Sequence, residues 1–258
     1  MNLPLPQDLT VEKSEVEYDG ASWISVDARL VGQDVAMSDY LTAWQRLIDG
    51  GDRTGALTRH LAFLTGSPES DRQLSALLAN LVDARIAEER LELVIRYAEF
   101  DRECVVSFES PYFGDTSDAP ASVADVVRVH NGIGWESPGG GGFGFIGFVD
   151  GCFVGGGGWE SEALLDAEED NRDFLDQLSR AGLTADDVVS PSDYGQNWLI
   201  WHPVEKNLRG EPAIYFVSHG DCVATAVARA NDLAFGQLLL AIMVQEILGQ
   251  DVLDQVHN

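Results

Sequence analysis

The chain has 258 residues, enough for one large domain or two small ones, and 45% of them are hydrophobic, so a sizeable core can be buried. Sixteen Lys and Arg stand against 43 Asp and Glu, which gives a formal net charge of −27. A chain with this charge should be repelled by nucleic acid and by anionic membranes, because both are negatively charged, and it should attract basic proteins. Solubility and a saline cytoplasm are alternative explanations for the same acidity.

The N-terminus and the apolar segments predict a soluble, cytoplasmic protein. The first residues, MNLPLPQDLTVEK, lack the basic and apolar regions of a signal peptide. The longest apolar stretch, Leu238 to Val244, is far shorter than the roughly 20 residues that span a bilayer. Three dispersed cysteines without C-x-x-C spacing fit core residues in a reducing compartment, and they predict no metal or redox centre.

Turn signals and periodicity predict a hairpin and three helices in the first 90 residues. Asp19-Gly20 is a turn signal between extended runs, so residues 16–31 are predicted to form a β-hairpin. Apolar residues at helical spacing predict three helices, over residues 41–48, 57–64 and 74–86. Ser70 or Asp71, just after Pro68, is expected to cap the third helix.

The pattern then changes to period two, which predicts strands. Residues 91–98 alternate between apolar and other side chains, and residues 104–109 are their expected partner strand. The loop over residues 110–120 favours a boundary nearby, although the strands before it fit either side. We therefore expect a hairpin and a mainly helical section over residues 1–100, and an α+β domain over residues 101–258.

A short helix is predicted from residue 121 to His130. Asn131-Gly132 is a good helix stop because both residues tolerate the left-handed conformation. At that position an imidazolium would interact favourably with the helix dipole, so His130 is expected to be structural rather than a metal ligand.

The glycine-rich stretch from Ser137 to Glu160 contains a literal G-x-G-x-x-G, residues 142–147. A dinucleotide-binding loop needs a strand before the glycines and a helix that begins on them. Here a loop precedes the glycines and aromatic residues follow, which is poor helix material. The stretch therefore predicts short, closely packed strands, with a hairpin turn at Asp150-Gly151.

The last hundred residues alternate between helical and extended patterns. Residues 160–183 predict an amphipathic helix with a strongly acidic face, which is either solvated or a docking site for a basic partner. Three strands are then predicted, over residues 196–203, 212–219 and 222–227. A long apolar helix is predicted after Asn231 or Asp232, over residues 233–249, and it must pack on the sheet.

Three segments resemble the SMI1/KNR4 family, also called the SUKH superfamily. They are PASVADVVRVHNGIGW, DYGQNWLIWHP and EPAIYFVSHGDCVATAVARANDLAFGQLLLAIM, and the resemblance covers roughly residues 101–250. The chain departs from the family pattern at Ala119, where a Leu commonly precedes the Pro, and at Gln196, where an acidic residue often follows the Gly. The resemblance implies an α+β fold whose mixed or antiparallel sheet is flanked by helices.

The resemblance also implies a function. Bacterial members of the family are similar to immunity proteins, which bind and neutralise toxin domains, many of them nucleases. Such a partner is often basic because it must bind nucleic acid, and acidic side chains would steer it and compete for its phosphate-binding groups. The expected partner is therefore a basic protein, and its expected form is a toxin domain.

No catalytic, metal-binding or cofactor-binding motif is present. The chain lacks H-E-x-x-H, G-x-S-x-G and G-x-x-x-x-G-K-[ST], and no two of its five histidines are spaced as a metal pair on one helix turn. We therefore predict no catalytic residues, no metal site and no cofactor. A dispersed triad leaves an unrecognised hydrolase as an alternative, and a scaffold or regulatory protein in a saline cytoplasm is another.

Aromatic residues beside acids suit a protein interface, whereas the usual burial of tryptophan favours a core position for Trp135, Trp159, Trp198 and Trp201. Trp198 and Trp201 are three residues apart, so on a strand they would point to opposite faces. The expected partner contacts are Trp135, Glu136, Trp159, Glu160, Asp166, Glu169, Asp170, Asp173, Asp193 and Tyr194.

Overall fold

The computed structural model describes residues 34–98, 102–136, 142–153, 172–183, 192–194, 197–218, 223–226, 233–250 and 252. All of them belong to one compact unit, residues 32–258. The hairpin expected over residues 16–31 lies outside the described residues.

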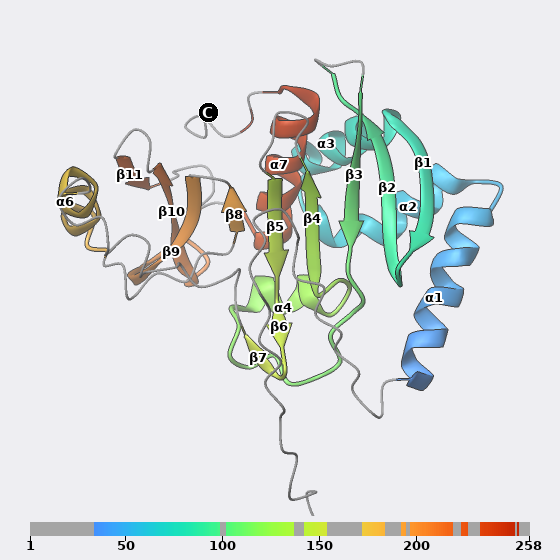
Figure 1. The fold of residues 1–258 in the computed structure, drawn as a ribbon, viewed down its shortest axis with the longest axis horizontal. Coiled ribbons are helices and arrows are strands. Elements are labelled where there is room, and N and C mark those ends of the chain that lie inside the picture. The colour runs from blue at the N-terminus through green and yellow to red at the C-terminus, as the bar shows by residue number, and fades with distance from the viewer. Residues whose placement is uncertain are drawn as a thin grey trace, which may run out of the picture. The chain divides into compact units, whose positions relative to one another are not determined.

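Nine of the described strands form one antiparallel sheet, and their order across the sheet follows their order in the chain (Figure 1). In sheet order they are β1 (Leu81–Ala87), β2 (Arg90–Arg96), β3 (Glu103–Phe108), β4 (Gly132–Glu136), β5 (Gly142–Ile146), β8 (Ser192–Tyr194), β9 (Asn197–Lys206), β10 (Pro212–Ser218) and β11 (Val223–Ala226). A small separate hairpin, β6 (Phe148–Val149) and β7 (Cys152–Phe153), turns at Asp150-Gly151 as its sequence predicts.

The helices complete an α+β fold, as expected. They are α1 (Asp34–Asp49), α2 (Arg53–His60), the 3₁₀ turn η1 (Leu61–Leu64), α3 (Pro68–Ala79), α4 (Ala121–Val127), α6 (Arg172–Arg180) and α7 (Phe235–Leu248). The C-terminal helix α7 packs against α3, α4 and η1, whereas α1 packs against β1 and α2, and α6 against β11.

The core lies between the helices and one face of the sheet. In β2, Leu91, Leu93 and Ile95 share one face and are fully buried, whereas Glu92 and Arg96 lie on the other face. The row continues across the sheet, because Leu93 pairs with Val106 and Val106 with Trp135. Helix α7 covers this row from the other side, since its residues 235–244 are all buried, which explains the unbroken apolar run from Leu238 to Val244.

Two predictions for residues 67–87 are wrong. The third helix ends at Ala79 instead of reaching residue 86, and residues 81–87 form the edge strand β1, because pairing with β2 outweighs the local helical spacing. Its N-cap is Ser67 rather than Ser70 or Asp71, and Ser67 and Ser70 form a reciprocal capping box around Pro68.

The sheet also continues across the boundary expected between residues 100 and 101. Strands β2 and β3 lie on either side of that point and pair over six residues each, from Leu91 to Arg96 and from Glu103 to Phe108. The described helices before it cover the same core as the helices after it. Residues 34–98 are therefore part of the same unit as the sheet rather than a separate section.

The turn between β1 and β2 has an unusual sequence for its geometry. Ala87 pairs with Arg90, so the loop has only two residues, Glu88 and Glu89, with φ of 49° and 64°. Positive φ at both loop positions defines the type I′ turn, which strongly favours Asn-Gly because side chains at positive φ are strained.

We expect the double variant Glu88→Asn, Glu89→Gly to stabilise the protein by about 1–2 kcal/mol, because it relieves this strain. Urea unfolding measures the change. The control is Glu88→Gln, Glu89→Gln, which removes the same two charges but keeps the strain, and it should leave stability nearly unchanged. Equal gains from both variants would show that charge, not backbone conformation, sets the effect.

Candidate functional site

The central strands of the sheet carry glycines on the face opposite the helices. Gly134 of β4 pairs with Ser107 of β3 on one side and with Gly144 of β5 on the other, and Gly144 pairs with Asp193 of β8. These register positions alternate with the buried row of Trp135, so they share the other face. The face therefore has a strip without side chains across β4 and β5.

The glycines permit close approach rather than phosphate binding. A Cβ at Gly132 would lie 2.7 Å from Cγ of Glu109 and 2.9 Å from the carbonyl oxygen of Phe145, and one at Gly134 would lie 3.1 Å from the carbonyl oxygen of Phe143. Within the G-x-G-x-x-G, residues 142–146 are strand β5, as predicted, instead of the start of a helix.

Trp135, expected to contact a partner, lies in the core. Its exposed fraction is 3%, and its indole stacks on Phe143 with ring centroids 4.3 Å apart. Its place in the strand alternation directs it to the helix-covered face, so it contributes packing rather than surface. Trp201 of β9, another of the four tryptophans considered, is likewise buried.

Of the other expected contact residues, four lie in described strands or in α6, and five lie outside the described residues. Glu136 pairs with Gly142, and Asp193 pairs with Gly144, so β5 brings these two acidic positions to the same sheet face from β4 and β8. Tyr194 of β8 pairs with Asn197 and Asp173 lies in α6. Those outside the described residues are Trp159, Glu160, Asp166, Glu169 and Asp170.

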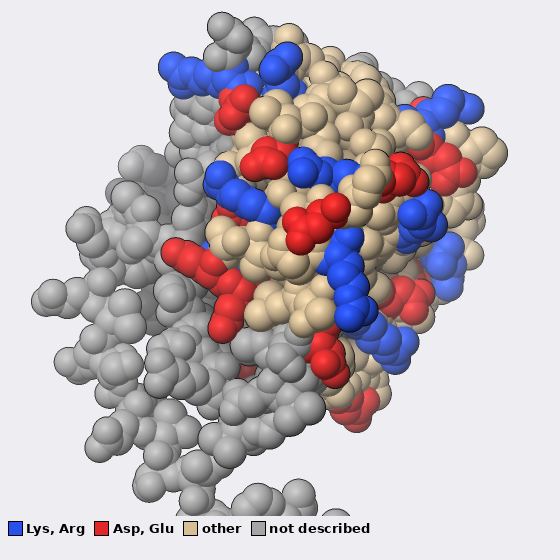
Figure 2. Space-filling view, turned by 90° about the vertical axis from the view of Figure 1, so that its right-hand side faces the viewer, with Lys and Arg blue, Asp and Glu red and all other residues tan. Residues whose placement is uncertain are grey.

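The charges of the first part of the sheet are largely paired. Five arginines between residues 34 and 98 lie within 4 Å of carboxylates, among them Arg85 with Glu92 and Arg90 with Glu109, each at 2.7 Å. Figure 2 shows the result on the side of α1 and β1, where Lys and Arg are interspersed with Asp and Glu. Paired charges of opposite sign largely cancel at a distance.

Helix α6 belongs to the strongly acidic segment and is anchored to the other half of the sheet. His202 of β9, which is buried, donates its Nε2–H to the carbonyl oxygen of Ala181, just after the helix, at 2.9 Å. Its Nδ1 accepts from the backbone N–H of Val204 and of Glu205. Both ring nitrogens are thereby used, and the end of α6 is fixed to β9.

His130 is structural, but not in the way expected. It is fully buried after α4, where its Nδ1 lies 2.8 Å from the carbonyl oxygen of Glu109 and its Nε2 lies 2.9 Å from Nε2 of His60. Desolvation lowers the pKa of His130 to about 3, so the ring is neutral and is no imidazolium on the helix dipole. Sequence reasoning missed its partner His60 because the two lie 70 positions apart.

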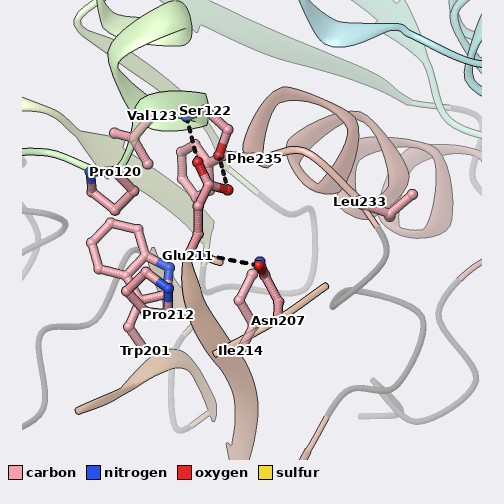
Figure 3. Close-up of a pocket in the computed structure, with 10 residues that line it drawn as sticks. All are labelled: Pro120, Ser122, Val123, Trp201, Asn207, Glu211, Pro212, Ile214, Leu233 and Phe235. Carbon is pink, nitrogen blue, oxygen red and sulfur yellow. Dashed lines mark hydrogen bonds between the residues drawn. The ribbon is translucent and has the colours of Figure 1, made fainter. Parts of the chain in front are cut away.

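A small hollow lies between α4, β9, β10 and the start of α7, and Glu211 is the charged residue that lines it (Figure 3). Its two carboxylate oxygens accept from the backbone N–H and the hydroxyl of Ser122, both at 2.7 Å. The free space is about 10 Å³, room for about one water molecule. Glu211 therefore acts as an N-terminal cap for α4, whose own N-cap position is Pro120 and has no side-chain oxygen.

We expect Glu211→Ala to destabilise the protein by about 1–3 kcal/mol, because it leaves the N–H of Ser122 without its acceptor. Glu211→Gln should cost less, since a Gln side chain can accept from the N–H and donate to the hydroxyl oxygen. Thermal unfolding of both variants measures the order. If Glu211→Gln is as damaging as Glu211→Ala, charge rather than hydrogen bonding holds this contact.

Within the part of the chain that the structure describes, no three His, Cys, Asp or Glu side chains are grouped as a metal site. No helix there is long and apolar enough to cross a membrane. Comparison with known protein families, with curated proteins and with solved structures finds no match to this chain.

Proposed function

We propose that this chain is a non-catalytic, acidic protein-binding module that acts in the cytoplasm on a basic protein. In its specific form, the partner is a toxin domain, in line with the resemblance to immunity proteins of the SMI1/KNR4 family. A nuclease toxin fits best, because a nucleic-acid-binding groove is basic.

One observation carries the proposal, the uneven distribution of charge. Residues 34–98 hold ten Asp or Glu and seven Arg, most of them ion-paired, whereas residues 154–191 hold ten Asp or Glu and only two Arg. The second segment therefore carries a net charge of −8, against −3 for the longer first segment, and contributes more to the negative field of the molecule than the first segment does.

The described part of the acidic segment, residues 172–183, is attached to a defined part of the fold. Its described helix, α6, packs on β11 and is tied to β9 through His202, and Leu178 on its inner side is fully buried. Asp176 is exposed on this helix, so it can attract and orient a basic partner from an element that packs on the sheet. Asp193 of β8 follows the same segment in the chain.

The test is affinity capture of basic proteins from the source cell's lysate at low and at high ionic strength, followed by reconstitution with the purified partner. We expect one stoichiometric basic partner, lost at high salt, whose toxic activity the chain inhibits. No partner at either ionic strength would overturn the proposal. Folding that then requires molar salt would favour the scaffold alternative.

A charge-matched pair of variants shows which acids matter. The first replaces Glu169, Asp170 and Asp176 by amides, and the second replaces Asp39, Asp49 and Glu103, which are exposed on α1 and β3. Both lose three negative charges. We expect the first to slow association with the partner at low salt by roughly tenfold, and the second by much less. Equal effects would show that only net charge acts.

A further inference from the structure

The ring of His130 is enclosed by side chains from several elements of the fold. The nearest ring centroids are those of His60 and Phe108, each at 5.0 Å, then Trp44 at 5.4 Å and Phe63 at 5.7 Å. Trp44, His60 and Phe63 belong to α1, α2 and η1, whereas Phe108 belongs to β3. The histidine pair, His60 and His130, therefore lies where the N-terminal helices meet the sheet.

The hydrogen bonds fix where the protons sit. A backbone carbonyl can only accept, so Nδ1 of His130 carries the proton that is shared with Glu109 O. In the neutral ring, Nε2 of His130 is then a bare acceptor, and Nε2 of His60 must donate to it. A further proton on His130 would set two N–H groups against each other, 2.9 Å apart. A further proton on His60 would add a charge beside aromatic rings.

No described group compensates such a charge. The carboxylate of Glu109 is turned to Arg90 at 2.7 Å, and burial raises the pKa of Glu109. On α1, Tyr40 lies against Trp44 with ring centroids 4.8 Å apart, and burial raises its pKa, so it stays neutral in acid. On α4, Asp125 pairs with Arg128 at the surface. Among the described residues, no carboxylate accepts a hydrogen bond from either histidine ring.

We propose that the histidine pair is an acid-sensitive contact, and that proton uptake by it loosens the packing of α1, α2 and η1 around His130 before the sheet itself opens. This inference is independent of the proposed partner.

The direction of the effect follows from linkage. Desolvation lowers the pKa of both rings in the closed form, so the open form binds protons first. The contact therefore has its full strength above about pH 6.5, the ordinary pKa of histidine, and weakens as the pH falls toward 3. Glu109 acts in the opposite sense, because its raised pKa favours the closed form in acid.

Hydrogen exchange of the full chain between pH 7 and pH 5, corrected for intrinsic rates, tests the proposal. The opening constant of amides in residues 40–64 should rise with acid, by up to about 100-fold per pH unit if two protons are taken up, since each proton contributes tenfold. Amides of β2 and β3 should lag behind. Equal acceleration in both regions, or no dependence on pH, would overturn the proposal.

Two variants identify the groups that take up the protons. In His60→Gln the side-chain amide can still donate to Nε2 of His130. The pH dependence of the opening constant should then fall to at most about tenfold per pH unit. Glu109→Gln removes the carboxyl group of the residue whose backbone carbonyl accepts from His130. The opening constant should then keep its wild-type dependence on pH or depend on it more steeply. If His60→Gln keeps the full dependence, or if Glu109→Gln abolishes it, the histidine pair is not responsible. Should His60→Gln fail to fold, the pH dependence of the opening constant in the wild type and in Glu109→Gln still tests whether the histidine pair takes up the protons.

Discussion

Replacing Gly236 by alanine is expected to destabilise the protein by about 2–3 kcal/mol, the upper part of the usual range for an overpacked core. A Cβ at this position would overlap the backbone carbonyl oxygen of Phe63 and lie 3.3 Å from Cα of Leu64. Both atoms belong to the backbone of η1, so neither can rotate away. The loss should appear although alanine favours a helix over glycine by about 1 kcal/mol.

Urea unfolding monitored by circular dichroism measures this loss, and Gly51→Ala is the matched control. Gly51 lies in the exposed turn before α2, and a Cβ there would meet no atom within 4 Å. The control should change stability by less than about 0.5 kcal/mol. If Gly236→Ala is as stable as wild type, α7 does not approach η1 as closely as described.

The second large effect is expected at Asn131, which joins α4 to the β6 strand. Its side-chain amide donates to the carbonyl oxygen of Phe148 at 2.7 Å, and its side-chain oxygen accepts from the N–H of the same residue at 2.8 Å. Asn131→Asp has the same shape but loses the donor and places a carboxylate against the carbonyl. We expect a loss of about 2–4 kcal/mol, measured by urea unfolding at neutral pH.

Asn207 provides the control for this substitution. Its side-chain oxygen accepts from the N–H of Arg209 at 2.9 Å and of Glu211 at 3.0 Å, and these are the contacts that the turn requires. An aspartate accepts equally well, so Asn207→Asp should leave stability within about 0.5 kcal/mol of wild type. A similar loss in both variants would assign the effect to added negative charge rather than to the lost donor.

The periodicity of apolar residues predicted the helices and strands correctly where the local pattern and the tertiary environment agree. The predictions for β2, β3, α4 and α7 are confirmed, because their apolar residues face one core and no competing partner shifts them. The glycine-rich residues 142–146 are also confirmed as strand, since nothing before or after them could support a nucleotide-binding helix.

Local pattern failed where a distant partner decides the structure. Residues 81–86 continue the helical spacing of α3, and only pairing with β2 makes them a strand. The turn that closes this pair is Glu88-Glu89, which lacks the Asn-Gly signal by which a type I′ turn is recognised. A hairpin without a turn signal cannot be found from spacing alone.

The site was predicted less well than the fold, for a related reason. The position of Trp135 beside an acid suggested an interface, but strand alternation turns its indole toward the helices. The neutral state of His130 depends on burial and on His60, and neither is visible in the local sequence. What composition did predict is the concentration of acid in residues 154–191, which needs no knowledge of contacts.

The strand order of the sheet has a consequence for how the protein is made. Because the order of the strands in the sheet follows their order in the chain, the sheet can grow strand by strand during synthesis, with one long interval between β5 and β8. Its apolar face is different, because α7, which covers it, begins only at Phe235. A nascent chain therefore leaves the part of that face that α7 covers exposed until residues 235–248 have been made, and in this interval it most needs protection from aggregation.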